Sequence, residues 1–246
     1  MMKQGQYKVV YNRKIAAEFY QMRLEGDTSA FTRGGQFADV AIDSLFLRRP
    51  FAAKEWDSDG FTLIYRTVGE GTSKMTEMLP GTVLDVLTGL GNGFDAGACR
   101  KSALVVCGGL GASPAFSLVK ELVSLGRKVT VILGFNRAED VVLADEYGAL
   151  GAEVQIATLD GSVGIKGFVT DAIDAVRPEY DFFYTCGPKV MMKAVCDKLS
   201  GPGEVSLEER MGCGCGICYG CTCHTASGPK RICADGPVFR KEEVIW

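Results

Sequence analysis

The sequence predicts an N-terminal antiparallel β-barrel, an α/β domain with a doubly wound parallel sheet, and a small C-terminal cysteine-rich subdomain. Three observations point to this fold class. Residues 1–98 alternate apolar and polar side chains over short stretches, and residues 99–205 carry short apolar runs separated by helical segments. Residues 206–246 are rich in glycine and cysteine and too few to hold a core of their own. We expect these ranges to be the units of the fold.

The first unit is predicted to be a small barrel or sandwich of short strands. Glycine-containing turns separate stretches whose side chains alternate between apolar and polar. Such alternation is typical of strands with one face in a core and the other in solvent. Strands are expected near 7–11, 14–24, 37–43, 61–68 and 82–87.

The second unit is predicted to contain a parallel sheet. Its apolar runs have the length of strands, and continuous apolar runs are typical of strands buried on both faces. The runs lie at 103–107, 129–133, 153–158 and 181–185. The segments between them favour helices, and alternating strands and helices of this length predict a doubly wound sheet.

The helices of this unit have recognisable ends. The first is expected to have Ser113 as its N-cap and Pro114 as its first residue, and to stop at Gly126. Further helices are expected at 139–147, 166–176 and 188–199.

Two turns follow predicted strands and open predicted helices. They contain Gly108, Gly109 and Gly111, and Cys186, Gly187 and Pro188. The carboxyl ends of parallel strands face one crevice, and helix N-termini present unpaired N–H groups to phosphates. The first turn lacks the strict G-x-G-x-x-G spacing, so a simple tight connection is the alternative reading. Together the two turns predict a nucleotide site.

Charge and hydropathy argue against several classes of function. The formal net charge of −3 offers no basic face for nucleic acid. No apolar run reaches the roughly 18 residues of a membrane helix, and glycines and a proline interrupt the longest candidate, 102–116. The first residues lack the apolar core of a signal peptide. We therefore expect a cytoplasmic chain that binds neither nucleic acid nor membrane.

The most specific motif is a group of cysteines near the C-terminus. Cys213, Cys218 and Cys221 have the spacing C-x4-C-x2-C, and Cys233 follows after eleven further residues. This is the plant-type [2Fe–2S] arrangement, in which three thiolates share a tight loop and a fourth comes from a neighbouring segment. Glycines throughout the loop allow its backbone to curl and to point N–H groups at sulfur. The motif predicts an iron–sulfur cluster.

The cysteines allow other kinds of metal site. Structural zinc is the alternative, although zinc ribbons usually present two short C-x2-C knuckles and this segment has one. A Rieske centre needs two histidines, and His224 is the only histidine. His224 is expected at the surface or beside the ligands, and Cys215 and Cys223 are expected not to be ligands. The remaining thiols are expected to act as small buried side chains: Cys99, Cys107, Cys186 and Cys196.

These motifs together resemble the ferredoxin-reductase-like electron-transfer subunits of NAD-dependent dihydroorotate dehydrogenase, nearly end to end. The cysteine segment is the most specific match. Further matches are LTGLGNGFD at 87–95, the glycine loop at 108–111, CGP at 186–188, LEERMGCG at 207–214 and CADGPVF at 233–239.

The resemblance implies a set of FAD-binding residues in the first unit. They are Arg49, Pro50, Phe51, Ala52, Ile64, Tyr65, Arg66, Gly71 and Thr72. The first four look like the family's flavin motif R-P-x-S, with Ala52 in place of the serine, which puts one flavin hydrogen bond in doubt. The next three look like the second flavin strand, and the last two end a run that resembles the turn around the FAD pyrophosphate.

The resemblance also implies a function. A catalytic dihydroorotate dehydrogenase subunit, an FMN-containing barrel, would oxidise dihydroorotate, and this chain would carry the electrons through [2Fe–2S] and FAD to NAD+ in a heterotetramer of two plus two. A related FAD and iron–sulfur subunit of an NADH-dependent ferredoxin:NADP oxidoreductase or sulfide dehydrogenase is an alternative. A zinc-stabilised nucleotide-binding interaction protein is an alternative of another class. Asn136, Arg137 and Asp140 leave the choice between NAD and NADP open.

Overall fold

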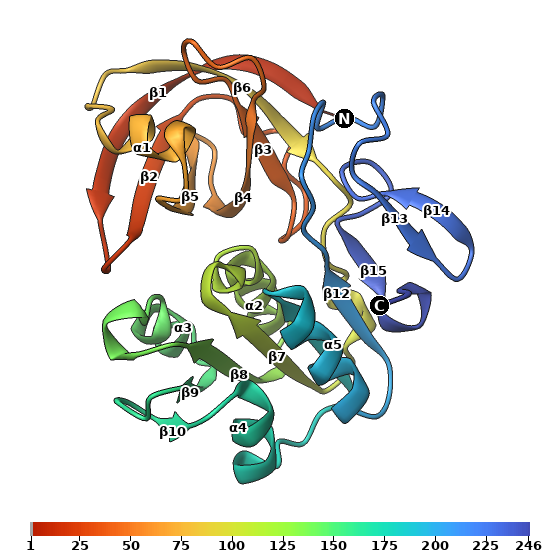
Figure 1. The fold of residues 1–246 in the computed structure, drawn as a ribbon. Coiled ribbons are helices and arrows are strands. Elements are labelled where there is room, and N and C mark those ends of the chain that lie inside the picture. The colour runs from red at the N-terminus through yellow and green to blue at the C-terminus, as the bar shows by residue number, and fades with distance from the viewer. Residues whose placement is uncertain (1) are drawn as a thin grey trace.

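The computed structural model describes residues 2–246, and its N-terminal part is a closed antiparallel barrel. The strand order is β1-β2-β5-β4-β3-β6. The strands are β1 (Lys3–Lys14), β2 (Phe19–Glu25), β3 (Phe37–Val40), β4 (Arg49–Trp56), β5 (Gly60–Arg66) and β6 (Val83–Leu90). A short helix, α1 (Glu70–Thr76), lies between β5 and β6. In Figure 1 the barrel forms the upper part of the molecule.

The barrel core follows from the alternation of the strands. Met22 and Leu24 of β2, and Phe61 and Leu63 of β5, are fully buried inside it. On β3, Ala38 belongs to the same interior cluster, whereas Phe37 belongs to another cluster that contains cysteines of the C-terminal subdomain. Neighbouring residues of one strand therefore face the barrel core and the cysteine subdomain.

The second part is a sheet of seven strands in the order β10-β9-β8-β7-β11-β12-β15. All neighbouring pairs are parallel except β12 with β15. The strands are β7 (Ser102–Gly108), β8 (Lys128–Phe135), β9 (Glu153–Thr158), β10 (Ile165–Lys166), β11 (Phe182–Cys186), β12 (Gly203–Ser206) and β15 (Val238–Arg240). Helices cover both faces, which is the doubly wound arrangement that the alternating pattern predicts.

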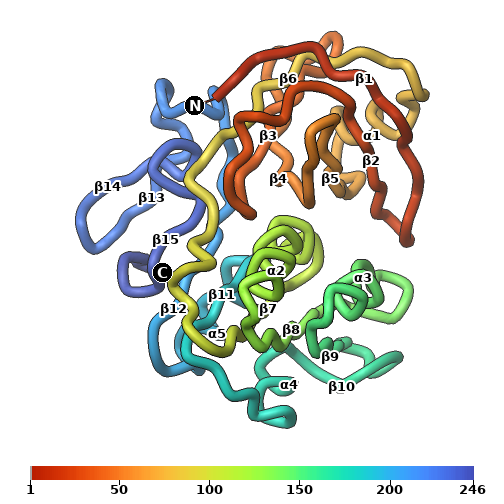
Figure 2. Tube along the Cα trace, turned by 180° about the vertical axis from the view of Figure 1, so that it is seen from behind, coloured from red at the N-terminus to blue at the C-terminus, as the bar shows by residue number. Residues whose placement is uncertain are grey.

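Each face of this sheet has its own helices and core. Side chains of α2 (Ala115–Ser124) and α3 (Ala144–Ala149) pack with Val105 of β7 on one face. Those of α4 (Val169–Val176) and α5 (Lys189–Lys198) pack with Leu104 on the other. Figure 2 shows the barrel above this domain from behind, with the segment after β6 running down between them.

The C-terminal cysteine loop lies beside the barrel and the sheet (Figure 1). It is followed by a hairpin of β13 (Thr222–Thr225) and β14 (Gly228–Arg231). The chain then returns to the large sheet as its antiparallel edge strand β15. Short 3-10 turns lie at η1 (Ala96–Ala98), η2 (Gly109–Ala112), η3 (Ala138–Asp140) and η4 (Lys241–Glu243). Among the described residues, no helix has both the length and the apolar content needed to cross a membrane.

Several local expectations were wrong, and tertiary contacts explain them. The strand expected at 14–24 is divided by a turn between β1 and β2, where Ile15 packs against the α/β core. The helix expected at 139–147 is replaced by η3 and α3, because Val142 and Leu143 are buried in the same core and Leu143 has a φ of 66°. Strand β4 and helix α1 were not expected.

Helix starts also differ from the expectation. Helix α2 begins at Ala115 with Pro114 as its N-cap, so Ser113 is the C-cap of the preceding turn η2 and not the N-cap of α2. The segment at 166–176 forms β10 and α4 rather than one helix, because Gly167 adopts a φ of 126° between them.

Candidate functional site

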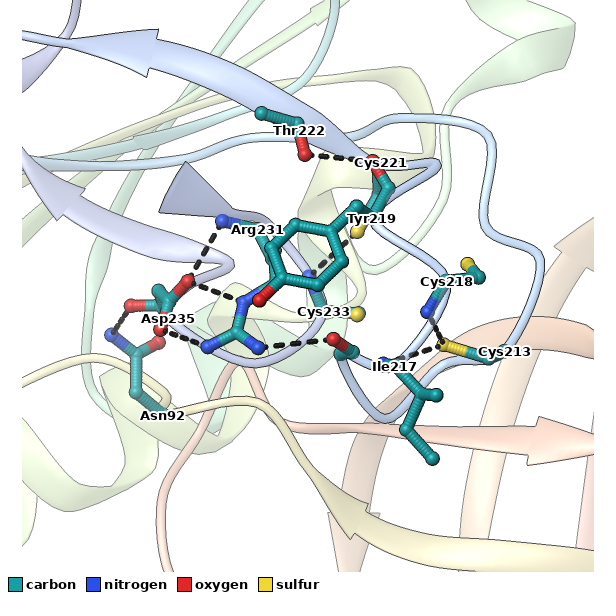
Figure 3. A network of polar contacts seen from close by, with 11 residues as sticks. Asn92, Cys213, Ile217, Cys218, Tyr219, Cys221, Thr222, Arg231, Cys233 and Asp235 are labelled. Carbon is teal, nitrogen blue, oxygen red and sulfur yellow. Dashed lines mark hydrogen bonds and ion pairs between the residues drawn. The ribbon is translucent and has the colours of Figure 1, made fainter. Parts of the chain in front are cut away.

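The four predicted cluster thiols form two pairs in the loop after β12. Cys213 lies against Cys218, whose side chain hydrogen-bonds to it, and Cys221 lies against Cys233 in the same way. Figure 3 shows the first pair on one side of the loop and the second pair on the other. Among residues 2–246, no three His, Cys, Asp or Glu side chains are grouped tightly enough for a single metal ion. Two pairs of thiols are the donor set of a cluster with two irons.

Backbone N–H groups point at these sulfurs. The Cys213 sulfur accepts from Ile217 at 3.2 Å and from Cys218 at 3.4 Å. The Cys221 sulfur accepts from the N–H of Cys233 at 3.4 Å. Partial burial by itself would raise the pKa of Cys213, but the hydrogen bonds from Cys218, Cys215 and Ile217 outweigh it and lower the pKa. The loop thus stabilises the thiolate of Cys213, the form that binds iron, whereas burial raises the pKa of the Cys233 thiol to about 12.

Glycine is required where the loop meets other segments. Gly214 has a φ of 66°, and a Cβ atom there would lie 2.5 Å from the Asp39 carboxylate of β3. Gly216 has a φ of 87°, and its Cβ would lie 2.7 Å from the side chain of Ala234. Both positions therefore combine a left-handed backbone with a close approach.

An ion pair holds the segment that carries the fourth cysteine. The Arg231 guanidinium donates to both Asp235 oxygens, at 2.9 and 3.0 Å, and to the carbonyl of Gly216 at 3.0 Å (Figure 3). Asn92, after β6, donates to the Val238 carbonyl at 2.8 Å and accepts from its N–H at 3.1 Å. The segments 87–95 and 233–239, matched separately in the sequence, therefore meet here.

A cavity of about 280 Å³ opens between the barrel and the α/β domain; we call it the barrel cavity. Eight of the predicted site residues line it: Pro50, Phe51, Ala52, Ile64, Tyr65, Arg66, Thr72 and Cys186. The two other predicted FAD residues, Arg49 and Gly71, are not part of its lining, and they pack against each other: a Cβ atom at Gly71 would lie 2.9 Å from the Arg49 Nε. The structure thus brings together residues that the sequence separates widely.

Polar groups in the barrel cavity are prepared for a ligand. The Ser113 hydroxyl is 3% exposed, lines the cavity and has no hydrogen-bond partner within residues 2–246. A buried hydroxyl without a partner costs free energy unless a bound group satisfies it. The Tyr65 hydroxyl donates to Asn12 at 2.9 Å, and burial raises the pKa of Tyr65 to about 12. The cavity therefore fits an aromatic cofactor with polar edges, such as a flavin.

A second cavity, of about 530 Å³, lies at the carboxyl edge of the parallel strands; we call it the sheet-edge cavity. Gly108, Gly109 and Pro188 of the predicted turns line it. Gly111 and Gly187 serve packing: a Cβ at Gly111 would collide with the Cys186 carbonyl, and one at Gly187 would lie 2.9 Å from the Gly108 nitrogen. The turns thus pack into a single edge, as parallel topology requires.

Arg66 lines both cavities. Its guanidinium is held by Glu18 at 2.7 Å, from the turn between β1 and β2. A ligand in the barrel cavity and one in the sheet-edge cavity would therefore meet beside Arg66.

Comparison with known proteins decides the family. Residues 208–245 match the family described as the iron–sulfur cluster binding domain of dihydroorotate dehydrogenase B, and residues 105–197 match the oxidoreductase NAD-binding domain. Over all of both chains, 43% of residues are identical to the dihydroorotate dehydrogenase B (NAD(+)) electron transfer subunit of Geobacillus sp. (strain WCH70). The subunit of Listeria monocytogenes serotype 4b is 41% identical over 99% of each chain. The chain belongs to this family of electron transfer subunits.

Solved structures share the fold of this chain. An NADH-dependent reduced ferredoxin-NADP oxidoreductase superposes with a TM-score of 0.89 and 29% identity over 98% of this chain and 90% of that chain. A ferredoxin NADP+ reductase from Neisseria gonorrhoeae superposes with a TM-score of 0.68 and 15% identity, over 80% of this chain and 92% of that chain, and shows the fold alone. The predicted fold class, oxidoreductase class and cofactor set of FAD, an iron–sulfur cluster and NAD(H) are confirmed.

Five residues that the sequence analysis did not predict to bind a cofactor also line the proposed flavin site. Phe37, Ser113, Leu207, Glu208 and Met211 all line the barrel cavity. Desolvation raises the pKa of the Glu208 carboxyl, whose side chain is open to the cavity. The outward position of Phe37 follows from the alternation of β3, but its neighbours come from distant segments that only the fold brings to it.

The remaining cysteines and His224 lie where they were expected. Cys99, Cys107 and Cys186 are buried, Cys196 is partly buried, and His224 is exposed on β13. Cys215 is partly buried, and its thiol hydrogen-bonds to Cys213. Desolvation raises the pKa of Cys215, and this hydrogen bond raises it further. Cys215 therefore lies beside the predicted cluster ligand Cys213.

Proposed function

We propose that this chain accepts electrons from a dihydroorotate-oxidising catalytic subunit at its [2Fe–2S] cluster and passes them through FAD to NAD+, in pyrimidine biosynthesis. The observation that carries the proposal is the order of the sites: paired cysteines, then the barrel cavity, then the sheet-edge cavity, each next to the following one. The full-length similarity to dihydroorotate dehydrogenase B electron transfer subunits supports the same reading.

Electrons and protons balance in the proposed reaction. Oxidation of dihydroorotate to orotate releases two electrons and two protons, NAD+ takes up the electrons with one proton as hydride, and one proton is released to solvent. FAD supplies the exchange between single electrons and hydride. Cys213, Cys218, Cys221 and Cys233 hold the irons in this proposal. The turns containing Gly108, Gly109 and Gly111, and Cys186, Gly187 and Pro188, hold the nicotinamide cofactor.

The proposed FAD residues are those implied by the family: Arg49, Pro50, Phe51, Ala52, Ile64, Tyr65, Arg66, Gly71 and Thr72. In this proposal these residues bind and orient the flavin, because most of them line the barrel cavity. Cys186, from one of the two predicted nicotinamide turns, lines the same cavity. We assign the FAD, nicotinamide and cluster units to 1–98, 99–205 and 206–246.

The proposed partner is an FMN-containing barrel subunit, with two copies of each chain in the complex. The relatives are named electron transfer subunits, which implies a separate catalytic subunit. The proposed compartment is the cytoplasm, where the ten free cysteines would stay reduced and available for iron.

One experiment tests this function. The chain is purified alone and with its catalytic subunit, and iron, flavin and visible absorption are measured before and after NADH. The chain alone should contain FAD and iron, oxidise NADH with an artificial acceptor and lack dihydroorotate activity, which should appear only in the complex. A colourless zinc protein, or dihydroorotate turnover by the chain alone, would contradict the proposal.

The second candidate is an NADH-dependent ferredoxin:NADP oxidoreductase subunit, favoured by the TM-score of 0.89 to such a structure. The lower identity, 29% against 43% to the Geobacillus subunit, ranks it second. Reduction by ferredoxin, with no stimulation by dihydroorotate and the catalytic subunit, would support this candidate.

A further inference from the structure

The two cysteine pairs of the cluster loop lie in different environments. Cys221 and Cys233 are each 2% exposed. Cys218 is exposed and Cys213 partly so. Next to the exposed pair, the side chains of Ile217 and Tyr219 are 78% and 64% exposed. One pair therefore faces the interior of the protein and the other faces solvent.

The interior pair shares its apolar cluster with residues of the barrel cavity. Phe37 of β3, 4% exposed, packs in one cluster with Cys221 and Cys233. Phe37 also lines the barrel cavity. Leu207 also packs in this cluster and lines the barrel cavity, and Met211 packs against the cluster and lines the cavity too. A continuous layer of packed side chains therefore joins the buried sulfurs to the proposed flavin site.

Of these residues, Phe37 is the one whose backbone is held by strand pairing on both sides. Its backbone is part of the barrel, paired with Ala52 of β4 on one side and Leu90 of β6 on the other. Ala52 itself lines the barrel cavity, and Leu90 packs in the cluster with the buried cysteines. The backbone of Phe37 is thus fixed between two strands, one that lines the barrel cavity and one that packs with the buried cysteines.

From this arrangement we infer that Phe37 is a positioning residue, whose ring fills the space between the buried pair, Cys221 and Cys233, and the proposed flavin site. The inference rests on the proposed function. In each transfer across this layer the cluster loses one electron and the flavin gains it, or the reverse when NADH is the donor. Electronic coupling decays more steeply through empty space than through packed atoms, so electrons should cross a packed ring faster than a void of the same width.

The test uses the cofactor-loaded chain reduced by NADH in a single turnover. Flavin bleaching is followed by absorbance, and cluster reduction by rapid freezing and electron paramagnetic resonance. FAD content, iron content, the bleaching rate and both midpoint potentials are measured for every variant, so that changes in cofactor binding and driving force are separated from the transfer rate. At equal cofactor content and driving force, Phe37→Leu should slow cluster reduction several-fold. Phe37→Ala should slow it further, because a larger void replaces the ring.

The matched control is Phe61→Leu, which truncates another fully buried ring, inside the barrel and away from the cysteine cluster. It should leave cluster reduction at the wild-type rate.

The outcomes separate the two proposals. If both Phe37 variants reduce the cluster as fast as wild type, or if Phe61→Leu slows it equally, the inference is overturned and the proposed function stands. If the wild-type chain carries FAD and iron but NADH does not reduce the cluster, the proposed function fails and the inference with it.

Discussion

The Lys54 ammonium of barrel strand β4 is ion-paired with Glu146 of helix α3, across the boundary between the barrel and the α/β domain. The Lys54 side chain is 1% exposed and lies 4.3 Å from the centre of the Phe116 ring, while Glu146 is 47% exposed. A second carboxylate, Glu55, lies 3.1 Å from the same ammonium. This pair joins the two units that bound the barrel cavity.

Loss of the Glu146 charge should destabilise the chain more than loss of the Lys54 charge. Glu146→Gln leaves a buried ammonium with one carboxylate, and should lower the free energy of unfolding by about 1–3 kcal/mol. Lys54→Met removes the buried charge and keeps the volume, so its effect should stay below about 1 kcal/mol. Urea unfolding measures both.

The control for this pair is Asp197→Asn in the exposed pair of Lys193 and Asp197, where the change should be about 0.5 kcal/mol or less. Equal losses for Glu146→Gln and Lys54→Met would show that the buried ammonium carries no special cost.

The assignment of ligands predicts a contrast between neighbouring cysteines. Cys221→Ser should lose nearly all bound iron and the cluster's visible absorption, because a thiolate of the buried pair is removed. Cys215→Ser should keep both, although the Cys215 thiol lies against Cys213. Iron analysis and absorption spectra give the result, and the opposite order would place Cys215 among the ligands.

The raised pKa of Tyr65 predicts that the folded state loses stability at alkaline pH. Burial raises its folded-state pKa from 10.0 to about 12, so the folded chain holds this proton more tightly than the unfolded chain. The stability that the neutral phenol contributes is fully present below pH 10 and is lost as the pH rises towards 12. Tyr65→Phe should therefore unfold with a smaller slope of free energy against pH in this window. Identical slopes for the two proteins would refute this.

The charges of Asp140 and Arg137 at the sheet-edge cavity predict a preference for NADH over NADPH. Asp140 lines the cavity with 16% of its side chain exposed, and Arg137 is engaged by Glu139 at 2.7 Å and by Asp140 at 3.5 Å. The cation is thus neutralised, and a carboxylate faces the ligand. Asp140→Asn should tighten NADPH binding by about 1 kcal/mol, roughly fivefold in Kd, with little change for NADH. Titration with both nucleotides measures the ratio, and an unchanged ratio would exclude Asp140 as a determinant.

The sequence determined those features that depend on local pattern. Alternation identified most barrel strands, continuous apolar runs identified β7, β8, β9 and β11, and the spacing of Cys213, Cys218 and Cys221 identified the cluster loop. Each of these signals is short-range, because strand burial and ligand spacing repeat over a few residues. The strand expected at 14–24 was wrong because the alternation continues through the turn that divides it.

Only the tertiary structure decided how these segments face one another. The division of the thiols into a buried and an exposed pair, the position of Phe37 between Cys221 and the barrel cavity, and the ion pair of Lys54 all join segments far apart in the chain. Such contacts are set by the packing of barrel, sheet and loop against one another. No local pattern of residues encodes which distant neighbour a buried side chain will meet.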